Sequence, residues 1–295
     1  RDSVERASDT TGTASSSPRS PDDEETLKLL LEVIKHHEEE KKKNTSSSSW
    51  SSTGNSMVYI PGRSFKMGTD NPKIFADGES PARPVLVSSF YMDKYEVSNE
   101  EYMQFVDATG YQTDSEKYGW SFVFHASVEK SLKESIQSAV KGAEWWLPVQ
   151  GSSWREPEGP GTDVFDTNRA DHPAIHISWT DADEYCKWRN NSRLPTEAEW
   201  EIAARGSTND KVTIFPWGNV FEPKSKSEST DNTSVGTRYY ANIYHGNFPN
   251  DNSALDGYKS TAPVHAYGPQ NDYGLYNMIG NAWEWCSDWW ARDHK

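Results

Sequence analysis

The sequence predicts a loop-rich α+β fold, and composition is the first reason. Its 295 residues include 13 Trp, 14 Tyr and 10 Phe, although only 34% of the chain is hydrophobic. Each enclosed aromatic ring buries about 150–250 Å², so rings can supply much of a core with few aliphatic residues. The second reason is that the helix signals are few and short, and the third is that the strand signals are scattered. Most of the chain is therefore expected to be ordered loop.

Residues 1–56 differ in composition from the rest of the chain. They are rich in Ser, Thr, Asp, Glu and Lys and contain one aromatic residue, Trp50. Such a segment cannot close a hydrophobic core, so we expect a disordered polar tail. Within it, residues 22–43 have acids first, lysines last and apolar residues at helical spacing. A solvated segment with transient helicity is the favoured interpretation, and a docking helix is the alternative.

Residues 57–295 are predicted to form a single domain with short strands. No Pro/Ser-rich linker divides them, and we expect the polar residues 225–235 to be a loop insertion within the domain. Turn residues such as Pro61 and Gly62 bound the strand signals. These signals cover residues 57–60, 85–92 and 174–178.

The clearest helix signals are capping boxes, in which a hydroxyl and a carboxylate three residues later satisfy free backbone N–H groups. Gly110 and Gly206 are placed to end the first and third of these helices. A weaker helix is predicted over residues 127–140, where apolar residues recur every four positions. The three boxes pair Ser98 with Glu101, Thr180 with Asp183, and Thr196 with Glu199.

The charge balance and hydropathy exclude two classes of protein. The formal net charge is −15, and the one basic run is residues 41–43, which argues against a nucleic-acid binder. The longest apolar stretch, residues 27–34, is interrupted by Lys28 and Glu32 and is far shorter than the roughly 20 residues of a membrane span. Because the chain begins with Arg1 and no apolar signal follows, we expect a secretion signal to be absent or removed and the chain to be a fragment or a processed form.

Two cysteines, Cys186 and Cys286, are too few for a disulfide-built scaffold and too far apart for a zinc knuckle. A buried thiol or a half-cystine is a better interpretation of Cys186 than a catalytic nucleophile. The two could pair with each other. We favour a partner for Cys186 beyond residue 295.

His172 and His176 have the four-residue spacing of a zinc-binding helix. However, Pro173 lies between them, and Ile175 and Ile177 alternate as in a strand. The pattern therefore does not match a His-Glu-x-x-His metal site, and structural histidines are expected.

Oxygen-bearing residues recur beside glycines in two irregular segments near the C-terminus. Ca²⁺ takes six to eight oxygen ligands at about 2.4 Å from carboxylates, amides and main-chain carbonyls, and a loop can offer several in sequence. Asn and Asp that merely close turns are the alternative that the pattern leaves open. The first group is Asn242, Ile243, Asp256 and Tyr258, and the second is Asn277, Gly280, Ala282 and Glu284.

Eight motifs, taken together and in order, resemble the formylglycine-generating enzyme, or sulfatase-modifying factor, family. They are MVYIPGRSFKMGT, FYMDKYEVSNEEY, WWLPV, HPAIHISWTDADEYCKW, RLPTEAEWE, FPWGN, ANIYHGNFP and YGLYNMIGNAWEW. The resemblance runs from about Met57 to Trp290 and leaves the N-terminal tail outside. It implies a loop-rich sulfatase-modifying-factor domain related to the C-type lectin fold, incomplete at its C-terminus. It also implies location in the endoplasmic reticulum lumen, which three glycosylation sequons in the chain support.

The resemblance also implies chemistry and cofactors. The family oxidises the cysteine of a Cys-x-Pro-x-Arg motif in nascent sulfatases to formylglycine with O₂, at a cysteine pair that binds Cu(I). In the family this pair follows the GNAWEW motif, and no residue here matches it, so we assign no catalytic residue and expect this chain to be inactive. The family's two structural Ca²⁺ sites map onto the two groups of four residues above. With the resemblance added, calcium becomes the favoured interpretation of both groups.

Departures from the family pattern leave a second hypothesis open. Ala204 replaces a structural cysteine of the enzyme, as in the family's non-catalytic paralogue, and Gly119-Trp120 is also similar to the paralogue. Asn281 and the MDKYEVSN motif are similar to the enzyme. Cys286 stands where a threonine is usual. The enzyme is favoured over a paralogue that binds sulfatases or dimerises with the enzyme, and a lectin-like module with structural calcium is a more remote third hypothesis.

Overall fold

The computed structural model describes residues 57–189, 192–207, 213–221 and 239–291 of the chain. All of them belong to one unit, Asn55–Lys295. The predicted tail, its helix over residues 22–43 and the predicted insertion over residues 225–235 lie outside the described residues. The domain boundary at residue 57 and the domain's incompleteness therefore stay predictions.

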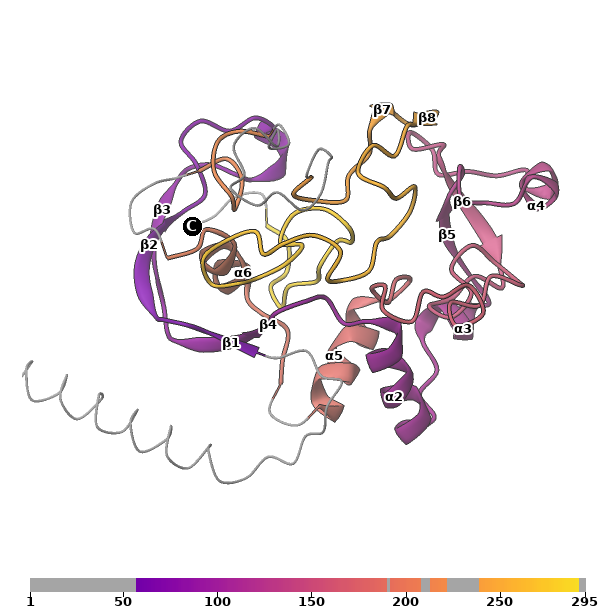
Figure 1. The fold of residues 1–295 in the computed structure, drawn as a ribbon, viewed down its shortest axis with the longest axis horizontal. Helices are drawn as coiled ribbons and strands as arrows, with labels where there is room; N and C mark the ends of the chain where they lie inside the picture. Colours follow the sequence, from indigo (N-terminus) through magenta and orange to yellow (C-terminus); the bar gives the residue numbers. More distant parts are fainter. Residues whose placement is uncertain (1–56, 190–191, 208–212, 222–238, 292–295) are drawn as a thin grey trace, which may run out of the picture. The chain divides into compact units, whose positions relative to one another are not determined.

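The strands form small two-stranded antiparallel sheets rather than one large sheet, which confirms the predicted loop-rich α+β class (Figure 1). In the described part of the chain there are four such pairs. They are β1 (Met57–Ile60) with β4 (Phe90–Asp93), β2 (Arg63–Met67) with β3 (Arg83–Val87), β5 (Trp120–Phe124) with β6 (Trp146–Gln150), and β7 (Gly246–Asn247) with β8 (Asp251–Asn252).

The strand at 57–60 is confirmed, but the single strand predicted over 85–92 is wrong. The chain changes partner after Val87, because β3 pairs with β2 whereas β4 pairs with β1. Gly62, in the turn between β1 and β2, lies against the backbone between β3 and β4, where only a residue without a side chain fits. A Cβ added to it would lie 2.5 Å from the backbone nitrogen of Ser89.

The strand predicted over 174–178 does not form. Pro173 makes a single bridge with Ser98, and the Ala174 nitrogen donates a hydrogen bond to the Val97 oxygen. His176 then adopts a left-handed φ of +59°, which ends any extended run. Ala174 and Ile177, three residues apart, pack against the same aromatic cluster, whereas in a strand they would face opposite sides.

Six helical segments lie within the described residues. They are η1 (Phe75–Asp77, a 3₁₀ turn), α2 (Asn99–Thr109), α3 (Asp114–Tyr118), α4 (Lys130–Ser135), α5 (Trp179–Trp188) and α6 (Glu197–Ala204). α2 and α5 lie side by side (Figure 1). None of the described helices is long and apolar enough to cross a membrane. The helix predicted over 127–140 is longer than the one that forms. Only α4 is helical in this stretch, and its 6 residues span fewer than two turns.

The capping boxes at Ser98 and Thr196 are confirmed, each with both of its reciprocal hydrogen bonds. Gly110 and Gly206 follow these helices with φ of +67° and +74°, as a helix-ending glycine requires. The box predicted at Thr180 is wrong by two residues, because Ser178 is the cap and Asp181 its partner. α3 was not predicted, although it begins with a box formed by Thr113 and Glu116.

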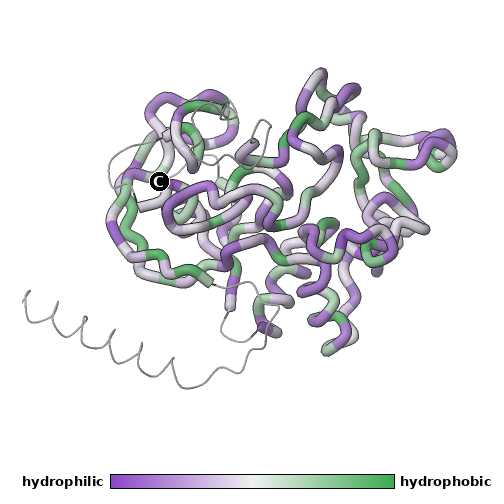
Figure 2. Tube along the Cα trace, viewed as in Figure 1, coloured by the Kyte–Doolittle hydropathy of each residue, from purple (hydrophilic) through white to green (hydrophobic). Residues whose placement is uncertain are grey.

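The core consists of three clusters, and only one of them is aromatic as the composition predicts. Tyr102, Phe105, Trp154 and Tyr185 pack between α2, α5 and the loop after β6. The other two clusters are mainly aliphatic. One joins β1, β3 and α6 to Leu275 and Met278, and the other joins β5 and β6 to α4. Figure 2 shows the corresponding hydrophobic stretches along the strands at the left of the view.

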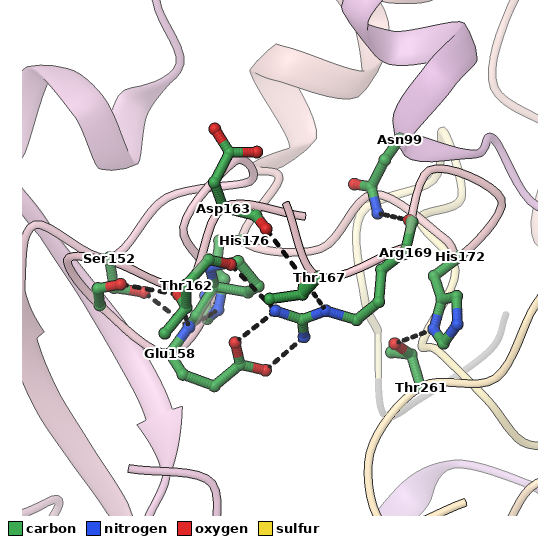
Figure 3. Close-up of polar contacts among 12 residues, drawn as sticks. Asn99, Ser152, Glu158, Thr162, Asp163, Thr167, Arg169, His172, His176 and Thr261 are labelled. Atoms are coloured by element: carbon green, nitrogen blue, oxygen red, sulfur yellow. Dashed lines mark hydrogen bonds and ion pairs between the residues drawn. The ribbon is translucent and has the colours of Figure 1, made fainter. Parts of the chain in front are cut away.

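A buried polar network fixes the long loop between β6 and α5 (Figure 3). The Arg169 guanidinium donates to both carboxylate oxygens of Glu158, at 2.6 and 2.8 Å, and also to the Thr162 carbonyl. The Asn99 side chain donates to the Arg169 carbonyl at 2.8 Å, which ties the start of α2 to this loop. Because both charged side chains are mostly buried, the pair acts as an internal clamp.

Candidate calcium sites

The first predicted group converges on the Asp256 carboxylate. Its Oδ2 accepts a hydrogen bond from the Ile243 nitrogen at 2.7 Å, and its Oδ1 accepts one from the Tyr258 nitrogen at 3.1 Å. The side chain of Asp256 is fully buried. Asn242, next to Ile243, is also buried. The loop therefore holds the Asp256 carboxylate against the backbone of Ile243 and Tyr258.

The second predicted group contains an amide oxygen with no protein partner. Asn277 is 2% exposed, and its Oδ1 accepts no hydrogen bond from the described residues. A buried acceptor left in this state costs about 1–3 kcal/mol unless something else satisfies it. Ca²⁺ prefers such an oxygen as a ligand. Asn277 thus offers an oxygen that a hard cation could bind, and its φ of +49° also places it in a turn.

The Glu96 carboxylate contacts Asn277 and is influenced by the charge of Glu284. Burial, with the charge of Glu284 as the second cause, raises the pKa of Glu96 to about 8. The residue Glu284 is exposed by area, but its carboxylate is surrounded by protein atoms, and this desolvation raises its pKa to about 7. Trp200 Nε1 donates to Glu284 Oε2 and holds the side chain in place. A divalent cation would offset the repulsion between the two carboxylates.

The two candidate sites are in direct contact. Asn242 Nδ2 donates to Asn281 Oδ1 at 3.0 Å, and the Asn281 nitrogen donates to the Asn242 carbonyl at 2.9 Å. Gly280 makes this approach possible, since a Cβ there would lie 2.5 Å from the Asn242 carbonyl oxygen. Residues 239–291, orange to yellow in Figure 1, carry both sites on loops, with only β7 and β8 as regular structure.

Sequence reasoning missed Glu96 and Asn281 as parts of this region. Glu96 lies between β4 and α2, about 180 residues before the amides that it contacts. No local pattern could have linked it to them. The described residues contain no group of three or more His, Cys, Asp and Glu side chains arranged for a metal. Calcium at either site stays a prediction.

The two histidines do not form a metal site in the structure. His176 Nε2 lies 2.8 Å from the Pro157 carbonyl, which can only accept, and its Nδ1 lies 2.9 Å from Ser121 Oγ. His172 Nδ1 lies 2.9 Å from Thr261 Oγ1. Both rings thus have hydrogen-bond partners within the protein. Burial lowers the pKa of both imidazoles below the usual 6.5.

Both cysteines have raised pKa values in the structure. Cys186 and Cys286 are free, so the alternative in which they pair with each other is not realised in the structure. Burial, together with neighbouring carboxylates, raises the pKa of the Cys186 thiol to about 11 and that of Cys286 to about 12. Cu(I) prefers soft thiolate ligands, whereas these two groups are protonated thiols at neutral pH.

Comparison with known proteins identifies relatives of two kinds. The chain is 51% identical over 244 residues to the formylglycine-generating enzyme of Bos taurus, covering 83% of this chain and 60% of that protein. It is 48% identical over 238 residues to the enzyme of Thermomonospora curvata, covering 80% and 72%. It is also 41% identical over 242 residues to the inactive C-alpha-formylglycine-generating enzyme 2 of Bos taurus, covering 81% and 73%.

The chain thus spans about 60% of the length of the Bos taurus and Mus musculus enzymes that it matches. The family model described as "Sulfatase-modifying factor enzyme 1-like domain" matches residues 42–295. This range contains the whole stretch of the eight motifs. The chain belongs to the sulfatase-modifying factor family of formylglycine-generating enzymes and their inactive paralogues.

Proposed function

We propose that the whole protein is an oxidase that converts the cysteine of a Cys-x-Pro-x-Arg motif in nascent sulfatases to formylglycine. The cysteine's side-chain carbon loses its sulfur as hydrogen sulfide and gains one oxygen atom of O₂. An external pair of thiols is oxidised to a disulfide and reduces the other oxygen atom to water. The full-length enzyme would use copper for this chemistry. No step is assigned to Cys186 or Cys286.

One observation carries this proposal: about half of the residues are identical to named formylglycine-generating enzymes over four-fifths of the chain. Identity to the inactive relatives is lower, at 41–42%. The proposed partners are newly made sulfatases, with a homodimer or a heterodimer with a paralogue as a further partner. The proposed location is the lumen of the endoplasmic reticulum.

The part of the protein described here would be the scaffold of that oxidase. We propose that two structural Ca²⁺ ions hold its long loops. Asn242, Ile243, Asp256 and Tyr258 would bind the first ion, and Asn277, Gly280, Ala282 and Glu284 would bind the second. The buried, unpartnered Asn277 Oδ1 and the buried Asp256 carboxylate support this assignment.

The alternative function is that of a non-catalytic paralogue that binds sulfatases or the enzyme and modulates it. Ala204 favours this alternative, because it stands where the enzyme carries a structural cysteine. It is 7% exposed and packs in the aliphatic cluster of α6. A cysteine in place of Ala204 would therefore have its thiol among buried apolar groups.

Co-expression separates the two functions. The gene's full reading frame would be expressed with a sulfatase in cells that lack their own formylglycine-generating activity, and the sulfatase would be assayed for an aldehyde by hydrazide labelling and mass spectrometry. The matched control is a sulfatase whose motif cysteine is replaced by alanine. An aldehyde supports the oxidase, and co-purification without an aldehyde supports the paralogue. If the two proteins neither react nor bind, both proposals fail.

A simpler assay tests the assignment of no catalytic residue to this chain. The 295-residue chain would be incubated with a Cys-x-Pro-x-Arg peptide, copper and O₂. We expect no formylglycine, because neither cysteine matches the family's copper-binding pair. Formation of the aldehyde would overturn this assignment.

A further inference from the structure

Glu96 makes contacts that its place in the sequence does not suggest. It follows β4 and precedes α2, yet its carboxylate lies among loop residues near the C-terminus. Its Oε2 accepts a hydrogen bond from Asn277 Nδ2 at 2.7 Å, and its Oε1 accepts one from Asn281 Nδ2 at 2.9 Å. Both oxygens of one carboxylate are therefore engaged by the amides of two asparagines.

These contacts determine which way the Asn277 amide points. Asn277 Nδ2 donates to Glu96 Oε2 and also to the Val264 carbonyl at 2.8 Å, which uses both of its hydrogens. In the flipped orientation, the amide oxygen would face the Val264 carbonyl, which can only accept. The oxygen and nitrogen of an asparagine amide are distinguished by such a network. The Val264 carbonyl and Glu96 together thus hold the orientation in which Oδ1 is the free end.

The free end is buried and has no protein partner. Asn277 is 2% exposed, and its backbone φ of +49° holds the residue in a left-handed turn that leaves little freedom for the side chain. Its Oδ1 has no hydrogen-bond donor among the described residues. A buried carbonyl-type oxygen, held by a carboxylate on its nitrogen side, is a preorganised ligand for a hard cation.

We propose that Glu96 is a positioning residue of the second calcium site, which acts by orienting the Asn277 amide so that Oδ1 faces the ion. This inference rests on the calcium binding proposed above, and it adds a residue outside the predicted ligand set. Glu96 acts through Asn277. It therefore differs from Glu284, which is one of the proposed ligands.

The test measures calcium binding of the 295-residue chain by titration calorimetry. Glu96→Gln keeps the size of the side chain but presents an amide nitrogen to at least one of the two asparagine donors. We expect it to weaken one of the two sites at least tenfold. Glu100→Gln is the matched control. Glu100 is exposed in the first turn of α2, and the substitution also replaces a carboxylate with an amide. Asp256→Asn identifies the signal of the first site.

A second background separates positioning from a direct or purely electrostatic effect. Asn277→Gly removes the amide and tolerates the positive φ. In this background, Glu96→Gln should cause no further change in calcium affinity. A further loss of tenfold or more would overturn the proposal, since Glu96 would then act without Asn277.

Thermal melting in a chelator separates positioning from a merely structural role. Glu96→Gln should lower the melting temperature more in calcium than in EGTA, because it removes calcium-dependent stabilisation in addition to a hydrogen bond. An equal fall with and without calcium would mean that Glu96 only supports the loop, and would overturn the inference. If the unsubstituted chain binds no calcium, the proposed calcium sites fail. If it binds two ions and Glu96→Gln binds them equally well, only this inference fails.

Discussion

Asn242 Nδ2 donates a hydrogen bond to Asn281 Oδ1 at 3.0 Å, and this bond joins the two candidate calcium sites. Asn242 belongs to the first predicted ligand group. Asn281 lies between Gly280 and Ala282 of the second group and also donates to Glu96. The two sites therefore share one hydrogen-bonded path, so damage at their junction should affect both.

Gly280→Ala tests this junction. The added Cβ would lie 2.5 Å from the Asn242 carbonyl oxygen, at a φ of +93° that disfavours alanine. We expect a loss of at least about 2 kcal/mol in the free energy of unfolding, measured by urea denaturation, and weaker calcium binding at both sites. Gly274→Ala is the control, since it has a φ of +79° and no atom within 4 Å of the added Cβ. Equal losses in the two variants would contradict the role given to this contact.

Glu158→Gln tests the clamp on the loop between β6 and α5. The change leaves the Arg169 guanidinium buried, with its side chain only 17% exposed, opposite a neutral group. Removing one partner of a buried ion pair costs about 3–5 kcal/mol, and denaturant midpoints should show a loss of that order. The corresponding change at Glu134, which lies 3.9 Å from Lys130 in an exposed pair, should leave the midpoint unchanged. A small effect at Glu158 would mean that the loop is held by its other contacts.

His176 should make stability depend on pH. Burial lowers its pKa from 6.5, so the unfolded chain binds a proton at a higher pH than the folded chain. The stabilisation is therefore present above about pH 6.5 and is lost as the pH falls through the lowered pKa. His176→Asn removes this titration and tolerates the φ of +59°. The slope of unfolding free energy against pH between 5 and 6.5 should fall by up to about 1.4 kcal/mol per pH unit. The slope above pH 7.5 should not change, and identical profiles throughout would refute the prediction.

Both cysteines should react slowly with alkylating agents. The raised pKa values, about 11 for Cys186 and about 12 for Cys286, leave little thiolate at pH 8. Labelling by iodoacetamide, followed by mass spectrometry, should be at least about tenfold slower than that of glutathione. Unfolding in urea should restore fast labelling. Fast labelling of the folded chain would contradict the raised pKa values of these thiols.

Local signals in the sequence predicted what depends on neighbouring residues. Ser98 with Glu101 and Thr196 with Glu199 are capping boxes, and each predicted the start of its helix correctly. The same rule failed at Thr180 because Ser178, two residues earlier, makes an equally good box, and Asp181 accepts a hydrogen bond from Tyr111 in the loop between α2 and α3. Local chemistry offered both starts, and the tertiary contact selected one.

Distant contacts explain the remaining errors. Residues 85–92 have the composition of one strand, but the partner strands β1 and β2 divide them in two. At the candidate sites, the motifs indicated the eight proposed ligands, whereas Glu96 required knowledge of contacts across 181 and 185 residues. A single sequence carries no signal for such contacts.

Calcium titration of the chelator-treated chain tests the central claim most directly. Calorimetry should find two Ca²⁺ ions per chain, and calcium should raise the melting temperature relative to EGTA. At a free calcium concentration of about 100 times Kd, each site would add about 2.7 kcal/mol to the stability of the folded state. No heat of binding, with superimposable melting curves in calcium and in EGTA, would contradict the claim that calcium holds these loops.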